Sequence, residues 1–243
     1  MKLTAAIISK TQPGDRLLRS LDFADQIVIV LDGNESKSSV RGKMNIFHHP
    51  LDNDFATQRN FALSRSKGDW VLFVDDDEII SRELQKEIVE KINSNNPVAY
   101  FIPRKDLVYH QALRHGETGN IKIIRLAKRD AGKFVRPVHE TWKIKGRVGE
   151  ISSPLYHTKD HFVSEFIPRM AQYAQLDAPI LEKENKPFST FRLLMNPLLK
   201  FILNYKIKGG IWDGYPGLFQ AYLMSIQSLS VRVFQWTNKN SSL

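Results

Sequence analysis

The chain has 243 residues, of which 42% are hydrophobic and 25% charged, a composition typical of a globular protein and not of a disordered or fibrous one. It contains no cysteine, which excludes a disulfide scaffold, a cysteine nucleophile and a thiolate zinc site. The formal net charge of +9 predicts anionic partners, such as nucleotides, nucleic acid or an anionic membrane face.

The first part of the chain alternates between strand-like and helix-like segments. Leu3–Ser9, Gln26–Leu31 and Met44–His48 are short runs of strand-favouring residues, and the first is too short for the core of a signal peptide. Arg16–Phe23 and Asp54–Ser66 are expected to be helices. Strands that alternate with helices are typical of a doubly wound nucleotide-binding half.

Two polar residues of this region are candidate ligand contacts. Asp32 follows the second strand, where an acid can accept hydrogen bonds from a nucleobase or ribose. The alternative is a plain turn, because Asp-Gly is a common turn pair. Arg59 is expected either to point towards a phosphate or to make a surface ion pair.

The most informative stretch is Lys67–Glu78, KGDWVLFVDDDE. Its apolar run Trp70–Val74 predicts a strand buried on both faces, and three aspartates follow at once: Asp75, Asp76 and Asp77. Ligands of open α/β sheets bind beyond the carboxyl ends of the strands. Adjacent carboxylates are costly to ionise together without a counter-charge, and a divalent cation that bridges to phosphates supplies one.

On an extended backbone Asp75 and Asp77 alternate, so both are expected to point to the same side. The alternative is a solvated acidic turn in which Asp77 or Ser81 caps a helix over Arg82–Ile92. The preceding buried strand favours the metal–phosphate site.

The middle of the chain is basic. Strands are expected at Val98–Pro103, Ile121–Leu126 and Thr141–Ile144. Five cations of this region are candidates to surround a pyrophosphate or an anionic acceptor, with a solvated basic face as the alternative. They are Arg125, Lys128, Arg129, Lys133 and Arg136.

Two further side chains of the middle region suggest chemistry. Glu140, in the segment Val138-His139-Glu140, is a candidate general base on a sugar hydroxyl, with a surface carboxylate as the alternative. His157 is a candidate metal ligand through a ring nitrogen, and His161 is the competing one. A structural histidine is the alternative for either.

The last part of the chain is helical in pattern and contains no apolar stretch that reaches the roughly 18–20 residues of a membrane span. Phe162–Glu184 predicts a long helix interrupted near Pro168 and Pro179. Pro187–Tyr205 and Leu218–Trp236 predict two amphipathic helices. These helices are expected to pack on the domain or on a twin subunit, or to lie in a membrane interface.

Taken in series, the motifs resemble family 2 glycosyltransferases of the GT-A fold, and within them the branch of lipopolysaccharide-core β-1,4-glucosyltransferases. The most specific block is DFATQRNFALSRSKGDWVLFVDDDE. It is accompanied in the same order by FADQIVIVLDGN before it and by AYFIPRKD, PVHETW, PLYH and YKIKGGIWDGYPGLFQAYLMS after it.

The resemblance implies a Rossmann-like mixed α/β sheet flanked by helices, followed by a C-terminal helical extension. Residues 1–160 would form the catalytic domain, with the nucleotide-sugar half over about 1–103 and the acceptor half over about 104–160. Residues 161–243 would form the extension.

Carried over by position, the resemblance assigns roles to the candidate residues. Asp75 and Asp77 would form the family's DxD-type motif, with Asp77 ligating Mg²⁺ or Mn²⁺ held by the donor diphosphate and His157 close to that metal. Asp75 or Asp76 would contact the ribose or the sugar.

The remaining roles fall on Asp32, which would recognise the base, on Arg59, which would line the donor pocket, and on Glu140, which would be the catalytic base. The chain departs from the family at two places. The family usually has an acid directly after the second strand and then a Ser/Thr-rich turn that ends in another acid, whereas here Leu31 precedes Asp32 and GNES replaces that turn. The opening loop SKTQPGD also lacks the more usual asparagine-glutamate pair.

The resemblance thus implies an inverting, metal-dependent hexosyltransferase that uses a nucleotide-sugar donor, UDP-linked by preference, and a glycan or lipid-linked acceptor of lipopolysaccharide core or a related cell-surface glycan. It would work in the cytoplasm, on the inner face of the cytoplasmic membrane, and would not bind nucleic acid. Its C-terminal helices would bind membrane or form a homodimer.

The alternative is a basic membrane- or nucleic-acid-binding module with a degenerate donor site. A Mg²⁺ phosphotransferase is disfavoured, because its nucleophilic aspartate commonly follows the first strand and Leu3–Ser9 has none.

Overall fold

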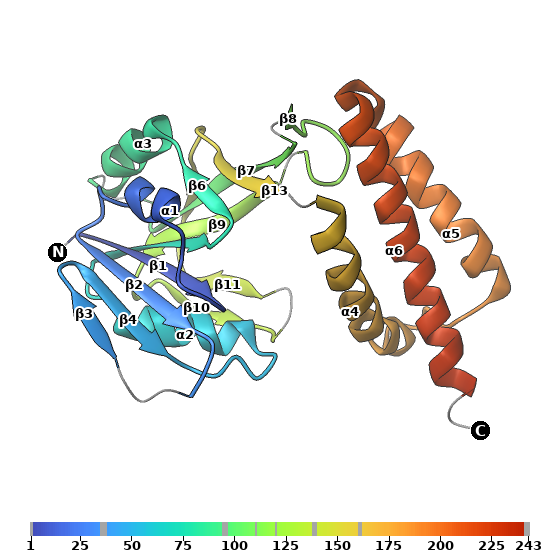
Figure 1. Cartoon of the computed structure of the whole chain (residues 1–243), viewed down its shortest axis with the longest axis horizontal. Helices are drawn as coiled ribbons and strands as arrows, with labels where there is room; N and C mark the ends of the chain where they lie inside the picture. The colour runs from blue at the N-terminus through green and yellow to red at the C-terminus, as the bar shows by residue number, and fades with distance from the viewer. Residues whose placement is uncertain are drawn as a thin grey trace. The chain divides into compact units, whose positions relative to one another are not determined.

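The computed structural model describes residues 2–34, 38–93, 97–109, 111–119, 121–137, 140–159 and 162–240. The chain divides into two compact units (Figure 1). The first contains Met1–Arg104 and Lys122–His157, and the second contains Lys105–Ile121 and Thr158–Leu243. Lys105–Ile121 belong to the same unit as the C-terminal helices, while the expected functional division into residues 1–160 and 161–243 stays a prediction.

The first unit begins with the parallel strands that the sequence predicts. Their bounds are β1 Leu3–Ser9, β2 Gln26–Leu31, β4 Met44–His48 and β5 Trp70–Asp75, and a short antiparallel edge strand, β3 Ser39–Arg41, pairs with β4. β1 pairs in parallel with β2 and β5, and β2 pairs in parallel with β4. The carboxyl ends of β1 and β5 therefore meet at one edge of the sheet.

Helices cover both faces of these strands. α1 (Asp15–Ser20) and α3 (Arg82–Ile92) pack on one face, where Leu17 and Ile88 join the core around Ile7. α2 (Phe55–Arg65) covers the other face, where its Ala62 joins the core around Phe73. Burying a large apolar side chain stabilises a fold by about 1.5–3 kcal/mol, so continuous apolar strands favour a sheet covered on both sides.

Strands that lie wholly or partly in the first unit complete a mixed sheet. The further strands are β6 Glu78–Ile80, β7 Ala99–Val108, β9 Ile121–Lys128, β12 Val148–Glu150 and β13 Leu155–Lys159, and a separate hairpin is formed by β10 Gly132–Val135 and β11 Thr141–Ile144. The sheet order is β3-β4-β2-β1-β5-β9-β7-β13-β6, with β12 beside β7. β9 runs antiparallel to β5 and β13 runs antiparallel to β6, so both bring side chains towards the end of β5. The predicted mixed α/β fold with a helical extension is confirmed.

The second unit is mainly helical. Its elements are β8 Gln111–Ala112, α4 Phe162–Lys183, α5 Thr190–Ile202, the π-helical turn η1 Leu203–Ile207, the 3₁₀ turn η2 Gly210–Asp213 and α6 Gly214–Asn240. α6 packs against both α4 and α5. A small core of Val108, Leu113, Phe162 and Leu223 joins its two chain segments. None of the helices in the described ranges is long and apolar enough to cross a membrane.

Two helix predictions need correction. The interruptions expected near Pro168 and Pro179 do not occur, because α4 runs through both prolines while its buried Met170, Ala174 and Ala178 keep it packed. Packing of this kind outweighs the loss of single backbone hydrogen bonds. α6 begins before Leu218, since a proline in the first turn, here Pro216, needs no intrahelical donor.

Candidate active site

The acid cluster lies at the carboxyl edge of the sheet, where β5 turns into β6. Asp75 is the last residue of β5, Asp76 and Asp77 form the turn, and Glu78 begins β6. The hydroxyl of Ser9, at the end of β1, donates to Asp76 Oδ2 at 2.5 Å. Two neighbouring parallel strands thus hold the cluster at the edge where open α/β sheets bind ligands.

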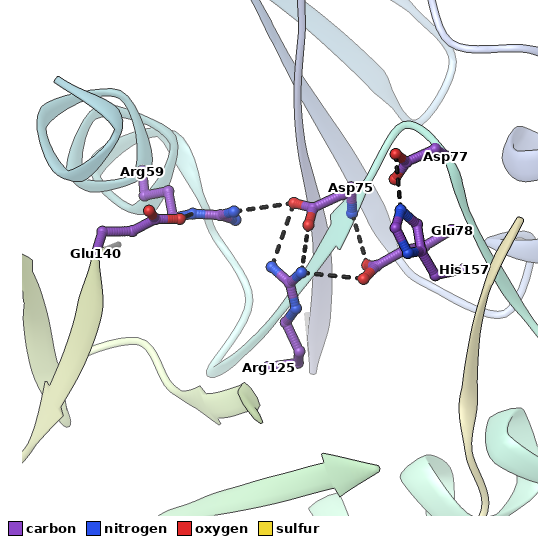
Figure 2. Close-up of polar contacts among 7 residues, drawn as sticks. All are labelled: Arg59, Asp75, Asp77, Glu78, Arg125, Glu140 and His157. Carbon is purple, nitrogen blue, oxygen red and sulfur yellow. Dashed lines mark hydrogen bonds and ion pairs between the residues drawn. The ribbon is translucent and has the colours of Figure 1, made fainter. Parts of the chain in front are cut away.

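Asp75 is held between two arginines (Figure 2). Arg59 Nη2 donates to its Oδ1 at 2.9 Å, and both terminal nitrogens of Arg125 contact the same carboxylate. Arg125 Nη2 also donates to Glu78 Oε1 at 3.0 Å, while the amide of Asp75 donates to Glu78 Oε2 at 2.9 Å. A forked guanidinium suits such bidentate recognition of carboxylates.

Charge and burial set the protonation of this network. Burial disfavours ionisation of Asp75, but the charges of Arg125 and Arg59 outweigh it and hold the pKa of Asp75 well below its usual range. Burial raises the pKa of Glu78, Asp75 adds to that effect, and Arg125 opposes it. For Arg125, burial lowers the pKa, but Asp75 and Glu78 raise it above its ordinary value. Asp75 and Arg125 therefore each stabilise the charged form of the other.

Arg59 joins this network to Glu140. Its Nε donates to Glu140 Oε1 at 2.6 Å, and its guanidinium carbon lies 5.5 Å from the ring centre of Phe73 and 5.6 Å from that of Phe134. The Arg59 side chain is 8% exposed and that of Glu140 is 18% exposed, so the predicted surface ion pair is a buried one. One guanidinium thus connects the candidate base with the first aspartate of the cluster.

The fold fixes the two elements that carry this connection. Asn60 of α2 exchanges two hydrogen bonds with the backbone of Phe134 in β10, at 2.9 and 3.0 Å. The amide of Phe55, the first residue of α2, donates to the carbonyl of Pro137 at 2.9 Å. Because α2 is tied to the hairpin at both places, Arg59 and Glu140 keep their relative positions.

Asp77 and His157 form a second pair beside the first. His157 Nε2 lies 2.9 Å from Asp77 Oδ2, and β13 places His157 opposite Glu78 in the sheet register. The His157 side chain is 9% exposed and that of Asp77 is 28% exposed. Carboxylate and imidazole are donors that suit Mg²⁺ or Mn²⁺ in mixed sites.

These two residues fit a cation that is shared with a ligand. Within the part of the chain that the structure describes, no group of three or more histidine, cysteine, aspartate or glutamate side chains is arranged to hold a metal. A cation held by Asp77 and His157 would therefore take its other ligands from the donor diphosphate or from water. His161, the competing candidate, and His139 lie outside the described residues.

Asp32 lies just after β2 and shapes a turn. Its Oδ1 accepts from the amide of Leu51 at 2.9 Å, and its own amide donates to the carbonyl of Ser9 at 3.0 Å. One carboxylate oxygen is thus engaged within the fold, which agrees with the turn alternative. The nucleobase role of Asp32 stays a prediction.

The structure corrects the expectation that Asp75 and Asp77 share one side. Figure 2 shows Asp75 directed to the two arginines and Asp77 directed to His157. The strand ends at Asp75, so the alternation of an extended backbone does not reach Asp77. The cap of α3 is Ser81, whose Oγ accepts from the amide of Leu84 at 3.2 Å, which leaves Asp77 for the site.

Arg125 and Glu78 are the site residues that sequence reasoning missed. Arg125 is expected above only as one of five cations around an anion, yet it lies inside the acid network. Lys128 and Arg129 do not join it there, since Lys128 pairs with Trp70 at the other end of β5 and Arg129 contacts the carbonyl of Ser66. The available signal was a charged residue within an apolar strand, which requires an opposite charge nearby.

Comparisons with known proteins place the chain in a family. The model of glycosyl transferase family 2 matches residues 15–144, more than half of the chain. An uncharacterized glycosyltransferase of Rickettsia felis is 26% identical, and the alignment covers 92% of this chain and 86% of that protein. The lipopolysaccharide core biosynthesis glycosyltransferase LpsC of Rhizobium meliloti is 22% identical, with 85% of this chain and 80% of that protein covered.

Among solved structures, S. aureus TarS (residues 1–349) in complex with UDP-GlcNAc is similar, with 17% identity, a TM-score of 0.44, and coverage of 99% of this chain and 92% of that one. The family model matches the chain from the start of α1 to the end of β11. This range includes five candidate site residues: Asp32, Arg59, Asp75, Asp77 and Glu140. The chain belongs to glycosyl transferase family 2.

Proposed function

We propose that the protein catalyses inverting transfer of a hexosyl group from a nucleotide-sugar, preferably a UDP-sugar, to a hydroxyl of lipopolysaccharide core or a related cell-surface glycan. The observation that supports it best is the guanidinium of Arg59, which joins Glu140 to Asp75 beside the Asp77–His157 pair. A base candidate and a candidate cation site are thereby held at one edge of the sheet. Displacement of the diphosphate by an acceptor hydroxyl requires both of them near the same anomeric carbon.

Glu140 is the base of this proposal. The acceptor oxygen forms a bond to the anomeric carbon, the bond from that carbon to the diphosphate breaks, and the diphosphate leaves with the electron pair. Glu140 takes the hydroxyl proton during the attack. Its Oε1 accepts from Arg59, so we assign Oε2 as the atom that receives the proton.

The donor would be held by the acid edge. Asp77 and His157 would bind a Mg²⁺ or Mn²⁺ ion together with the diphosphate, and such an ion neutralises the negative charge that grows on the leaving group. Asp76 would contact the ribose or the sugar, and Asp32 the base. Asp75 is engaged by two arginines, so we assign it, with Arg59, to positioning of the donor edge relative to Glu140.

The setting of the reaction follows from its reactants. A nucleotide-sugar and a lipid-linked acceptor meet at the inner face of the cytoplasmic membrane, and a chain without cysteine fits a reducing compartment. We therefore propose that the protein works in the cytoplasm at that face.

A donor screen tests this function. UDP-, GDP- and dTDP-sugars are added with and without Mn²⁺ or Mg²⁺, and the unfolding midpoint and nucleotide release are recorded. A ligand present at 100 times its Kd stabilises the folded state by about 2.7 kcal/mol, which raises the midpoint by a measurable amount.

The screen should give a metal-dependent shift with one donor class, and Asp77→Ala should lose that shift. The matched control is Asp130→Ala, an exposed acid of the same unit, which should keep it. Absence of a shift with every donor would refute the transferase proposal and favour a binding module with a degenerate donor site.

A further inference from the structure

One side of α6 is exposed and entirely apolar. Every exposed residue from Tyr215 to Trp236 is aromatic or aliphatic, and consecutive ones are alternately four and three residues apart. They are Tyr215, Phe219, Tyr222, Ile226, Leu229, Val233 and Trp236. Residues at this spacing lie along one face of a helix, and at 1.5 Å per residue the stripe is about 30 Å long.

The neighbouring elements of the second unit carry further exposed apolar side chains. α5 packs on α6, where Ser225 Oγ donates to the carbonyl of Pro197 at 2.7 Å and the rings of Phe201 and Tyr222 lie 4.7 Å apart. α5 has no buried residue, and its Phe191 is 71% exposed. Trp212 of η2 is 80% exposed. We call the exposed apolar residues of α5, η2 and α6 the apolar helical surface. Besides the seven residues of α6, it contains Phe191, Leu194, Leu198 and Leu199 of α5 and Ile211 and Trp212 of η2.

The opposite side of α6 carries polar groups that are buried. Arg232 Nη1 donates to Gln235 Oε1 at 2.6 Å, and Gln235 Nε2 donates to the carbonyl of Lys186 at 3.0 Å. The helix is thus apolar towards the outside and partly polar towards the inside. A continuous apolar surface of this length marks a contact with another protein or with a membrane.

Charge decides between these two partners. Residues 187–240 contain six lysines and arginines: Arg192, Lys200, Lys206, Lys208, Arg232 and Lys239. Lys200 and Lys208 pair with Glu117 of the same unit at 2.8 and 3.6 Å, and Arg232 is buried, so the positive charge of the surface comes from Arg192, Lys206 and Lys239. The only acid in that range is Asp213, which is 3% exposed and accepts from the amides of Arg114 and His115. A second copy would bring the same excess of cations against it, whereas an anionic lipid surface is complementary.

The aromatic residues agree with a lipid surface. Trp212 and Tyr215 lie at one end of the stripe and Trp236 at the other, and each is more than half exposed. Tryptophan and tyrosine favour the headgroup level of a bilayer, where the ring is in an apolar layer and its polar atom is hydrated. A helix that is apolar along its whole exposed side is suited to lie in the plane of the interface.

We propose that the apolar helical surface binds the interface of an anionic membrane, with α6 in the membrane plane. The exposed cations Lys206 and Lys239 would contact the lipid phosphates. This binding needs neither sugar donor nor acceptor, so it is independent of the proposed transfer reaction.

The test is sedimentation of the full chain with lipid vesicles, either phosphatidylcholine mixed with phosphatidylglycerol or phosphatidylcholine alone. A triple variant, Ile226→Gln, Leu229→Gln and Val233→Gln, removes the centre of the stripe without changing charge. It should bind the mixed vesicles more than about tenfold more weakly. The control is Val89→Gln on α3, which removes an exposed apolar residue of the first unit and should bind like the wild type.

A second variant separates charge from apolar contact. Lys206→Gln with Lys239→Gln should weaken binding to the mixed vesicles by about fivefold per lysine and leave binding to phosphatidylcholine almost unchanged. The unfolding midpoints of all variants should stay near that of the wild type, because the replaced side chains are exposed.

Three outcomes would overturn the proposal. One is a wild-type chain that does not sediment with the mixed vesicles, and another is a triple variant that binds them as well as the wild type. The third is a wild-type dimer in analytical ultracentrifugation that the triple variant converts to a monomer, without vesicle binding by either, which would assign the surface to a second copy. Donor-induced thermal shifts on the same samples report on the transferase proposal separately.

Discussion

Replacing Arg125 with methionine should destabilise the first unit, because one guanidinium compensates the buried carboxylate of Glu78 and the half-buried carboxylate of Asp75. The Arg125 side chain is 7% exposed, that of Glu78 is 0% exposed and that of Asp75 is 29% exposed. Removing one partner of a buried ion pair costs about 3–5 kcal/mol, since it leaves an uncompensated charge. Water screens part of the Asp75 charge, so we expect a loss near the lower end, about 3 kcal/mol.

The loss should depend on pH, with a sign set by Glu78. Burial raises the pKa of Glu78 in the folded chain, and removing Arg125 takes away the charge that opposes this rise. The folded variant then keeps a proton that the unfolded chain releases above its ordinary pKa of about 4.3. Stability falls with rising pH wherever the folded state binds more protons, so the deficit should be larger at pH 7 than at pH 5.

Asp75 contributes with the opposite sign. Its pKa is lowered in the folded wild-type chain, so the stability that it adds is present above its unfolded pKa of about 3.9 and is lost as the pH falls towards its folded value. In acid below about pH 4 the wild type should therefore lose part of its advantage over Arg125→Met.

Urea unfolding at pH 3 measures the effect of Asp75, and unfolding at pH 5 and pH 7 measures that of Glu78. Arg129→Met is the matched control, because Arg129 makes an exposed ion pair with Asp130 at 3.4 Å, and it should change stability by less than about 0.5 kcal/mol. Adding Glu78→Gln to Arg125→Met should restore part of the loss by removing one buried charge. A deficit below about 1 kcal/mol that is equal at pH 5 and pH 7 would refute this account of the network.

Two further variants test the elements that position the site. Arg59→Lys keeps the charge but removes the forked guanidinium that contacts both Asp75 and Glu140. Sugar transfer should therefore fall about a hundredfold, while the donor-induced thermal shift remains. Arg65→Lys on the same helix is the control and should transfer sugar like the wild type; equal activity of the two variants would contradict the positioning role of Arg59. Ser81→Ala removes the acceptor for the amide of Leu84 at the start of α3 and should cost about 1 kcal/mol in urea unfolding, whereas an unchanged midpoint would show that the cap adds nothing.

The sequence predicted the apolar strands well because their runs are short, continuous and bounded by turns, but it did not predict the short strands β3, β6, β8, β10 and β12. Met44–His48 and Thr141–Ile144 have the predicted bounds, and so does the helix Arg82–Ile92. Local pattern is sufficient where every residue of a segment favours the same structure. The continuous course of α4 through Pro168 and Pro179 was not predictable from local pattern, since tertiary packing decides it.

The sequence pointed to some of the candidate residues, but not to Glu78 or the role of Arg125, and not to the way the residues pair. The end of a buried strand and the family resemblance pointed to Asp75, Asp77, Glu140 and His157, but no local pattern says which cation faces which acid. Arg125 reaches Asp75 through the register of β9 with β5, a contact between residues 50 positions apart. The direction of Asp77 depends on where β5 ends, and strand ends are poorly marked in sequence.

The most direct test of the proposed reaction is nucleotide release by Glu140→Gln. The donor that the screen identifies is used with a lipopolysaccharide preparation of truncated core as acceptor, and Glu150→Gln, an exposed carboxylate on β12, is the control. Glu140→Gln should keep the donor-induced thermal shift and lose about 10²- to 10⁴-fold in release, while Glu150→Gln keeps both. Release by Glu140→Gln at the wild-type rate would contradict the assignment of Glu140 as the base.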